Sequence, residues 1–179
     1  MHLLAGMLPP VVTDADRELV ARQLGREPRT LHGVAVRCPF GAPAVTEQSP
    51  YAADGEPFPT TYYLTCRHLV AAVARLEAAG GVERWSEAVR GEPVLAASLA
   101  AGDEEQRRLR RELAGQTSGS DGRASLDYGI GGSRRGGSLK CLHAHGIRTR
   151  ASRLRAGGAH PRRDRAAMAR TVLFPVSRT

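Results

Sequence analysis

The residues best suited to chemistry lie in a glycine-rich segment that ends in one cysteine and two histidines, YGIGGSRRGGSLKCLHAH at residues 128–145. Its glycines can adopt backbone angles that other residues avoid, so successive N–H groups can point into one concavity. Ser138 can cap a helix that begins at Leu139, and the first turn of a helix carries partial positive charge. This segment therefore favours binding of an anion, either a phosphate or a carboxylate.

The predicted anion site combines loop glycines with hydroxyl and cationic side chains. It consists of Gly131, Gly132, Ser133, Arg134, Ser138 and Lys140, with Arg67 as a second clamp from a separate segment. A simpler interpretation is a connector whose glycines only permit a turn into the final helix. The segment lacks the G-x-x-x-x-G-K-[ST] pattern of a Walker loop, and no clear strand precedes it, which disfavours a dinucleotide fold.

Three cysteines and two histidines form a second candidate site, because tetrahedral zinc accepts three thiolates and one imidazole. The candidate ligands are Cys38, Cys66, Cys141, His143 and His145. No C-x-x-C pair occurs, so this site would require three distant segments to converge. On a helix Cys141 and His145 share a face, whereas His143 points nearly opposite. Buried, inert thiols are the commoner alternative.

A cysteine nucleophile is a third hypothesis. Cys66 and Cys141 both fall at predicted helix starts, where a thiolate is favoured. The bases that could activate them are His68, His143 and His145, and Asp127 is the candidate for the orienting third group. Such a set would suit acyl or phosphoryl transfer.

These residues must be positioned by an α+β fold. Hydrophobic periodicity, caps and glycine stops predict helices at 14–24, 66–79, 82–90 and 93–114, and strands at 31–37, 44–48 and 60–64. Thr13 and Thr65 are the predicted caps of the first two helices, and Gly102 is a predicted weak point of the last. The sequence therefore predicts a small antiparallel sheet of about three strands packed against four or five helices.

Two segments are predicted to face solvent. The second half of the last long helix, residues 103–113, is predicted to be a solvated amphipathic face with a Glu104–Arg108 pair. The glycine- and serine-rich residues 116–125 are predicted to be a flexible connector.

The charge is unevenly distributed along the chain. The net charge is +8, but the residues from Gly146 onward hold nine arginines and one aspartate, which leaves 17 basic and 17 acidic side chains in residues 1–145. The basic character therefore belongs to the tail, which could add non-specific, salt-sensitive affinity for nucleic acid. A dedicated nucleic-acid function is disfavoured.

The remaining composition favours a cytoplasmic protein with reduced thiols, since three widely spaced cysteines cannot all pair within one chain. No apolar run reaches the roughly 18–20 residues needed to span a bilayer. The first twelve residues lack a cationic start and meet Pro9 and Pro10 early, so we expect a flexible N-terminal arm.

Several ordered motifs resemble a bacterial family known only as domain of unknown function 501. They are RCPFGAPAVTEQSP, DGEPFPTTYYLTC, ARLEAAGGVE and GIGGSRRGGSLKCLHAH. The resemblance covers residues 13–145, which we expect to form a single domain. It implies no chemistry, because the family has no established activity or cofactor. The family motif stresses Cys141 and His143, in conflict with the helical spacing that pairs Cys141 with His145.

The Arg-rich residues 146–179 depart from the resemblance. They read either as an aberrant, out-of-frame ending, which is the favoured interpretation, or as a genuine basic extension. The leading functional prediction is thus a domain that binds a small anionic ligand at its glycine loop. The alternative is a non-enzymatic interaction module with a zinc site or buried thiols, acting through the helix at 103–113.

Overall fold

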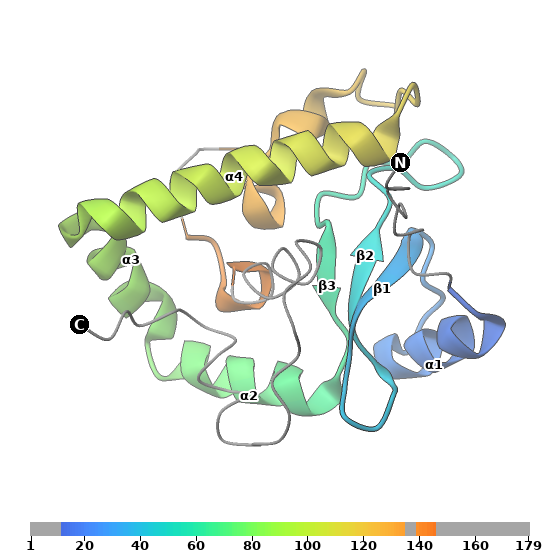
Figure 1. Ribbon diagram of the computed structural model, residues 1–179, viewed down its shortest axis with the longest axis horizontal. Helices are drawn as coiled ribbons and strands as arrows, with labels where there is room; N and C mark the ends of the chain where they lie inside the picture. The colour runs from blue at the N-terminus through green and yellow to red at the C-terminus, as the bar shows by residue number, and fades with distance from the viewer. Residues whose placement is uncertain (1–11, 135–138, 146–179) are drawn as a thin grey trace, which may run out of the picture.

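The computed structural model describes residues 12–134 and 139–145 (Figure 1). The elements are α1 (Asp14–Leu24), β1 (Leu31–Arg37), β2 (Pro43–Gln48), β3 (Tyr62–Leu64), α2 (Arg67–Ala78), α3 (Gly81–Gly91), α4 (Pro93–Ala114) and the short 3-10 turns η1 (Ala124–Asp127) and η2 (Ile130–Gly132). A last helical turn spans residues 142–145. The α+β prediction is confirmed, and the helices predicted at 14–24, 66–79, 82–90 and 93–114 and the three predicted strands are found within two residues of their expected ends. The last helix begins at residue 142 rather than at Leu139 as predicted.

The sheet is antiparallel, with β2 between its two neighbours in the order β1-β2-β3. Thr46 lies opposite Val34 of β1 and Tyr63 of β3. A tight turn joins β1 to β2, where the Cys38 N–H donates to the Ala42 carbonyl at 2.8 Å. All six residues of β2 are buried, so the central strand is covered on both faces.

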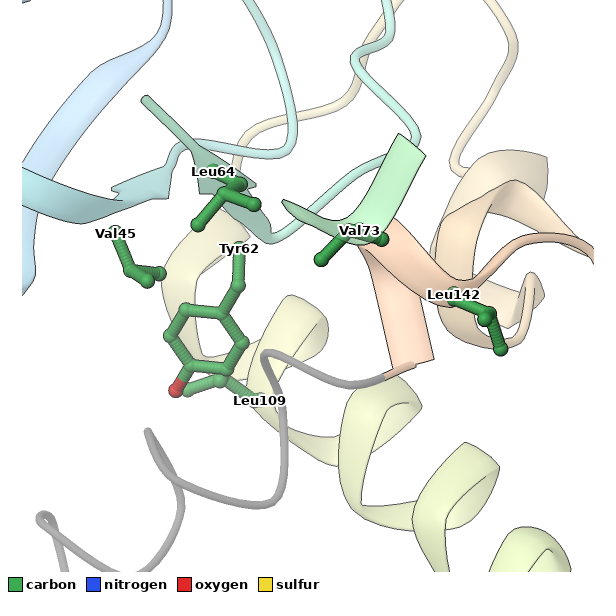
Figure 2. Packing of buried hydrophobic residues seen from close by; sticks show 6 residues of the cluster. All are labelled: Val45, Tyr62, Leu64, Val73, Leu109 and Leu142. Carbon is green, nitrogen blue, oxygen red and sulfur yellow. The ribbon is translucent and has the colours of Figure 1, made fainter. Parts of the chain in front are cut away.

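The two faces of the sheet are covered by different elements. Figure 1 shows α1 on one side, and α2, α4 and residues 142–145 on the other. The main core lies on this second side and consists of Val45, Tyr62, Leu64, Val73, Leu109 and Leu142 (Figure 2). Since Leu142 belongs to this core, the C-terminal cysteine–histidine motif is anchored in the domain.

The start of α1 is fixed by a capping box, as predicted for Thr13. The Thr13 hydroxyl accepts the Asp16 N–H at 3.1 Å, and Asp16 Oδ2 accepts the Thr13 N–H at 3.2 Å. Asp16 is buried and also binds the guanidinium of Arg37, at 2.6 and 2.7 Å. This ion pair therefore joins the first helix to the end of β1.

Two details of the helices differ from prediction. Thr65 does not cap α2, because its hydroxyl donates to the Pro43 carbonyl at 3.3 Å and Cys66 occupies the cap position without a side-chain bond. Gly102 does not break α4, which runs unbroken as a 22-residue helix. Gly102 is instead buried against the rest of the domain.

The prediction of a solvated face at residues 103–113 is wrong for one side of α4. Asp103, Gln106, Leu109 and Arg110 are buried. Gln106 donates to the Thr61 hydroxyl at 2.7 Å, so its buried amide has a partner in the loop before β3. The Glu104–Arg108 pair does not form either, since Arg108 binds Glu105 and Glu112.

Residues 116–125 are attached to the domain rather than forming a free connector. The Ser120 N–H donates to the Gly55 carbonyl at 2.9 Å, and the Arg123 side chain donates to the carbonyls of Gly115 and Thr117. Gly119 lies directly against the ring of Tyr51. The low-complexity composition therefore reflects close packing and tight turns.

Within the described ranges, 12–134 and 139–145, no helix combines the length and the apolar character needed to cross a membrane. The longest helix, α4, carries its charged residues from Asp103 onward.

Candidate functional site

The glycine loop folds back on itself. The Gly129 N–H donates to the Ser133 carbonyl at 2.8 Å, and the Gly132 N–H donates to the Gly129 carbonyl at 3.1 Å. A longer bond of 3.4 Å joins the Ser133 N–H to the Ile130 carbonyl. Gly131 and Gly132 have φ values of 66° and 75°, which favour glycine. Three N–H groups of the glycine-rich segment, those of Gly129, Gly132 and Ser133, are therefore satisfied inside the loop.

A carboxylate of the protein itself occupies the mouth of this loop. Asp103 of α4 is buried, and its Oδ1 accepts the Ile130 N–H at 2.9 Å. A Cβ atom on Gly129 would lie 2.6 Å from the same oxygen, so only glycine allows this approach. The loop does hold an anion, but that anion is a side chain of α4.

The other two loop glycines give close contacts to different elements. A Cβ atom on Gly131 would lie 2.9 Å from the Ala144 side chain, and one on Gly132 would lie 2.7 Å from Pro59. Together with Gly129 they bring the loop against α4, the β2–β3 connection and the last helical turn. Their described role is thus close packing.

A second carboxylate caps the last helical turn. Glu77 Oε1 of α2 accepts the N–H groups of Leu142 at 2.6 Å and His143 at 3.4 Å. Its Oε2 lies 3.1 Å from His143 Nδ1. Burial alone would raise the pKa of Glu77, but these N–H groups and the imidazole outweigh burial and lower the pKa.

The cations predicted to bind the anion have different surroundings. Arg134 is exposed and lies over the ring of Tyr128, with 5.4 Å from Cζ to the ring centre. Lys140 is exposed as well, whereas Arg67 donates to the Arg22 carbonyl at the end of α1, at 3.1 Å. Ser138 lies outside the described residues.

The three thiols lie at the ends of separate elements. Cys38 follows β1, Cys66 precedes α2 and Cys141 precedes the last helical turn; all three are free and half-buried. In the part of the chain that the structure describes, no three His, Cys, Asp or Glu side chains gather into a metal-binding group. His143 instead binds Glu77, and His145 Nδ1 lies 2.8 Å from the Cys141 carbonyl.

The carboxylate that contacts a candidate histidine is Glu77, not Asp127 as the nucleophile hypothesis predicted. Asp127 binds Arg111 of α4 rather than a histidine. Glu77 orients His143 in the way that a catalytic carboxylate would, two residues from Cys141. No hydrogen bond between the Cys141 thiol and the His143 imidazole is found in the described residues. The observed role of Glu77 is therefore to cap the last helical turn.

A cavity of about 140 Å³ lies on the opposite side of β2 from the main core. It is open to solvent and is lined by the end of α1, the start of β1, the end of β2 and the loop before β3. The lining residues are Leu24, Arg26, Pro28, Arg29, Thr30, Gln48, Ala52, Glu56, Pro57, Phe58 and Tyr63. Of the residues predicted to bind an anion or a metal, none of those that the structure describes lines it.

Two buried polar residues, Thr30 and Gln48, form the floor of the cavity and are hydrogen-bonded to each other. Thr30 donates to Gln48 Oε1 at 2.8 Å, and Gln48 Nε2 donates to the Thr46 hydroxyl at 2.7 Å. Phe58 and Tyr63 form an aromatic wall, with ring centres 6.2 Å apart. Polar groups on an apolar-walled floor are typical of small-molecule sites.

The rim of the cavity carries both signs of charge. Arg29 is held by Asp54 at 2.5 Å and by Glu56 at 2.7 Å, and these carboxylates raise the pKa of its guanidinium. Arg26 is exposed and has no ion pair with any described residue. Arg26 is therefore the rim cation that remains available to a ligand.

The sequence model of the family described as Protein of unknown function (DUF501) matches residues 34–161. The chain belongs to this family. The match begins later than the resemblance traced over 13–145 and continues through residues 146–161, so the DUF501 region does not end at His145. No curated protein and no solved structure matches the chain.

Sequence reasoning missed the DUF501 cavity because its parts come from four separated segments. A partial signal was present in Thr30 and Gln48. Gln48 ends one predicted strand, and Thr30 directly precedes Leu31, the residue that pairs with Gln48 at the start of the other strand. In an antiparallel hairpin such positions lie side by side. Nothing in the spacing could show that the loop before Tyr62 closes over them.

Proposed function

We propose that the DUF501 domain binds a small organic anion, bearing a carboxylate or a phosphate, in the cavity between α1 and the β2–β3 loop. The observation that carries this proposal is a cavity with a buried hydrogen-bonding floor and an unpaired arginine on its rim. Its volume of about 140 Å³ is below the several hundred Å³ of drug-sized pockets, so the ligand is small.

The floor retains hydrogen-bonding capacity for such a ligand. The Gln48 amide has two N–H donors, and Thr46 accepts from Nε2. The side-chain carbonyl of Gln48 already accepts a hydrogen bond from the Thr30 hydroxyl, and the Thr30 oxygen keeps its own acceptor lone pairs. The floor can therefore offer one donor and one acceptor to a bound molecule, which fits a carboxyl or hydroxyl group.

The charge on the rim favours an anionic group beside Arg26. The two carboxylates that hold Arg29 leave little attraction for a further anion at that guanidinium. Arg26 has no such partner among the described residues, and its planar fork matches a carboxylate or phosphate. The ligand would place its charge at the rim and its apolar part against Phe58 and Tyr63.

The glycine loop is the competing location for an anion. Arg134 and Lys140 give it exposed positive charge, but Asp103 introduces a carboxylate at its mouth. A second anion there would meet like charge, which disfavours binding. Among the described residues the cavity is lined by one acid, Glu56, which is paired with Arg29 on the rim.

Thermal unfolding with added phosphate, acetate, succinate or benzoate tests the proposal. A ligand that binds only the folded state raises the Tm in proportion to the logarithm of its concentration, once the site is saturated. We expect Arg26→Ala to abolish the rise and Arg17→Ala to keep it. Arg17 is the matched control because it is an exposed arginine of α1 that does not line the cavity.

Two other outcomes would overturn the cavity assignment. If Lys140→Ala or Arg134→Ala abolishes the rise while Arg26→Ala keeps it, the anion binds at the glycine loop. If none of the four probes raises the Tm, the domain does not bind small anions of this kind. Elemental analysis of the reduced, purified chain separately tests the zinc alternative.

A further inference from the structure

A buried polar cluster lies beneath the C-terminal half of α4, away from the cavity floor. Three of its atoms have no hydrogen-bond partner among the described residues: Tyr51 Oη, Arg110 Nη2 and Ser125 Oγ. All three residues are buried, and the Arg110 side chain is fully inaccessible, with 0% exposure. Buried polar groups are nearly always hydrogen-bonded, so three orphans in one region require an explanation.

The three atoms belong to residues that are neighbours in the interior. Arg110 Nε donates to the Ser125 carbonyl at 3.3 Å. Tyr51 packs against Leu126, the residue that follows Ser125, and against Ala114, one turn beyond Arg110 on α4. The orphaned atoms therefore come from three separate segments that meet in the interior.

Asp121 supplies the negative charge at this point. Its carboxylate accepts the Ser125 N–H at 2.8 Å and the Arg123 N–H at 3.1 Å. Burial raises the pKa of Asp121, but Ser125, Arg123 and the nearby Tyr51 hydroxyl outweigh burial and lower it. The two hydroxyls thus lie close to the carboxylate, although neither meets hydrogen-bond geometry in the structure.

Arg110 is fixed on two sides only. Nη1 donates to the Phe58 carbonyl at 2.8 Å and Nε to the Ser125 carbonyl, while Nη2 is left over. Burial lowers the pKa of this guanidinium, and the charges of Tyr51 and Asp121 oppose that effect. No carboxylate of the described residues forms an ion pair with it, so an acceptor beside Nη2 is required.

We propose that one ordered water molecule binds at the centre of this cluster, accepting from Arg110 Nη2 and exchanging hydrogen bonds with the hydroxyls of Tyr51 and Ser125. A single water accepts two and donates two hydrogen bonds, which satisfies all three orphans at once. A small anion fits less well, because the nearby Asp121 carboxylate would repel it.

The water has a structural consequence for the neighbouring loop. The water fixes the position of the Arg110 guanidinium, which donates to the Phe58 carbonyl. Phe58 in turn forms a wall of the cavity. The buried water therefore belongs to the support of that wall. The proposal itself does not depend on what the cavity binds.

A crystal structure of the full chain that resolves ordered water tests this directly. We expect a density peak about 2.7–3.2 Å from Arg110 Nη2 and from at least one of the two hydroxyls. Crystals grown with bromide test whether an anion, and not water, binds at this point. An anomalous bromide peak at this point, or no peak with Tyr51 turned directly onto Asp121, would overturn the proposal.

Thermal unfolding gives an independent test in solution. Tyr51→Phe and Ser125→Ala should each lower the Tm by about 2–4 °C, the shift expected for one lost hydrogen bond in a chain of this size. The double variant should lose less than the sum, because both hydroxyls bind the same water. Strictly additive losses would contradict a shared water. Tyr128→Phe and Ser98→Ala are matched controls outside the cluster, and neither should shift the Tm appreciably.

Discussion

Asp103 Oδ1 accepts the N–H of Ile130 at 2.9 Å, and the carboxylate lies directly against Gly129 at the mouth of the glycine loop. This contact joins the middle of α4 to the segment predicted to bind an external anion. The backbone chemistry expected of the loop is thus present, but it serves an internal carboxylate. A buried charged acceptor of this kind stabilises the loop that it binds.

Removing the resident carboxylate should expose the anion-binding character of the loop. We expect Asp103→Ala to lower the free energy of unfolding by about 2–3 kcal/mol, because the buried Ile130 N–H loses a charged acceptor. Formate or acetate at high concentration should then raise the Tm of this variant more than that of the parent, since either ion can replace the lost group.

Glu104→Ala is the control for this rescue, because Glu104 is the exposed neighbour of Asp103 and its one ion pair within the described residues is with Arg107. It should change stability by a few tenths of a kcal/mol and show no rescue. Equal responses of the parent and Asp103→Ala to formate would show that the loop has no anion-binding capacity of its own.

The Asp16–Arg37 pair should make stability fall in acid. Its guanidinium, together with Thr13, holds the pKa of Asp16 well below the ordinary value of 3.8, against the opposing effect of burial. A lowered folded-state pKa gives stabilisation that is complete above the unfolded-state pKa and is lost as the pH falls through the folded-state pKa. The loss should therefore begin near pH 4.

Asp16→Asn should remove this contribution. We expect a loss of about 1–2 kcal/mol at pH 7, moderated by the half-exposed position of Arg37, and a difference from the parent that shrinks below pH 4. Urea unfolding at pH 7, 5 and 3 measures it. Asp14→Asn, an exposed acid in the same turn, should cost about 0.5 kcal/mol or less. A pH-independent difference for Asp16→Asn would rule out the electrostatic explanation.

Local rules were sufficient for most of the fold. Thr13 and Gly25 delimit α1 because a capping box and a left-handed glycine act within a few residues of chain. Thr65 fails as a cap because the Pro43 carbonyl, from another strand, competes for its hydroxyl. Caps are thus readable from sequence except where a tertiary partner takes the capping side chain.

The candidate sites were less predictable, for a physical reason. Asp103, Gln106 and Arg110 have the composition of a solvent-facing stripe, yet each binds a backbone or side-chain group of a distant loop. A polar residue is buried only when its partner is delivered by the fold, and sequence spacing carries no information on that partner. The same holds for the cavity, whose floor and wall meet only in three dimensions.

A substitution at Gly119 can distinguish whether residues 116–125 are packed against the domain or flexible. A Cβ atom there would lie 2.1 Å from Tyr51 Cε1, so Gly119→Ala must displace a buried ring. We expect a loss of about 1–3 kcal/mol by thermal or urea unfolding. Gly91→Ala is the matched control, because no atom lies within 4 Å of the added methyl group at the end of α3. It should be neutral or stabilising by up to about 1 kcal/mol. A neutral Gly119→Ala would restore the flexible-connector interpretation.

The Glu77 carboxylate should stabilise the last helical turn, which carries the cysteine–histidine motif. Glu77→Gln keeps the shape of the side chain but replaces a carboxylate that accepts from Leu142 and His143 with a neutral amide. We expect a loss of about 1–2 kcal/mol, since charge-assisted bonds to backbone N–H groups are about twice as strong as neutral ones. Hydrogen exchange of residues 139–145 should accelerate, while exchange in α1 stays unchanged.

The alternative is that Leu142 alone anchors the motif through the core. Leu142 is 1% exposed and lies against Gly81, so apolar packing could keep the turn closed without its cap. In that case Glu77→Gln would leave exchange at 139–145 unchanged, and Leu142→Ala would accelerate it. Glu83→Gln, an exposed acid on α3, serves as the control in both experiments. Faster exchange in Glu77→Gln but not in Glu83→Gln would show that the carboxylate, and not packing alone, holds Cys141 and His143 in place.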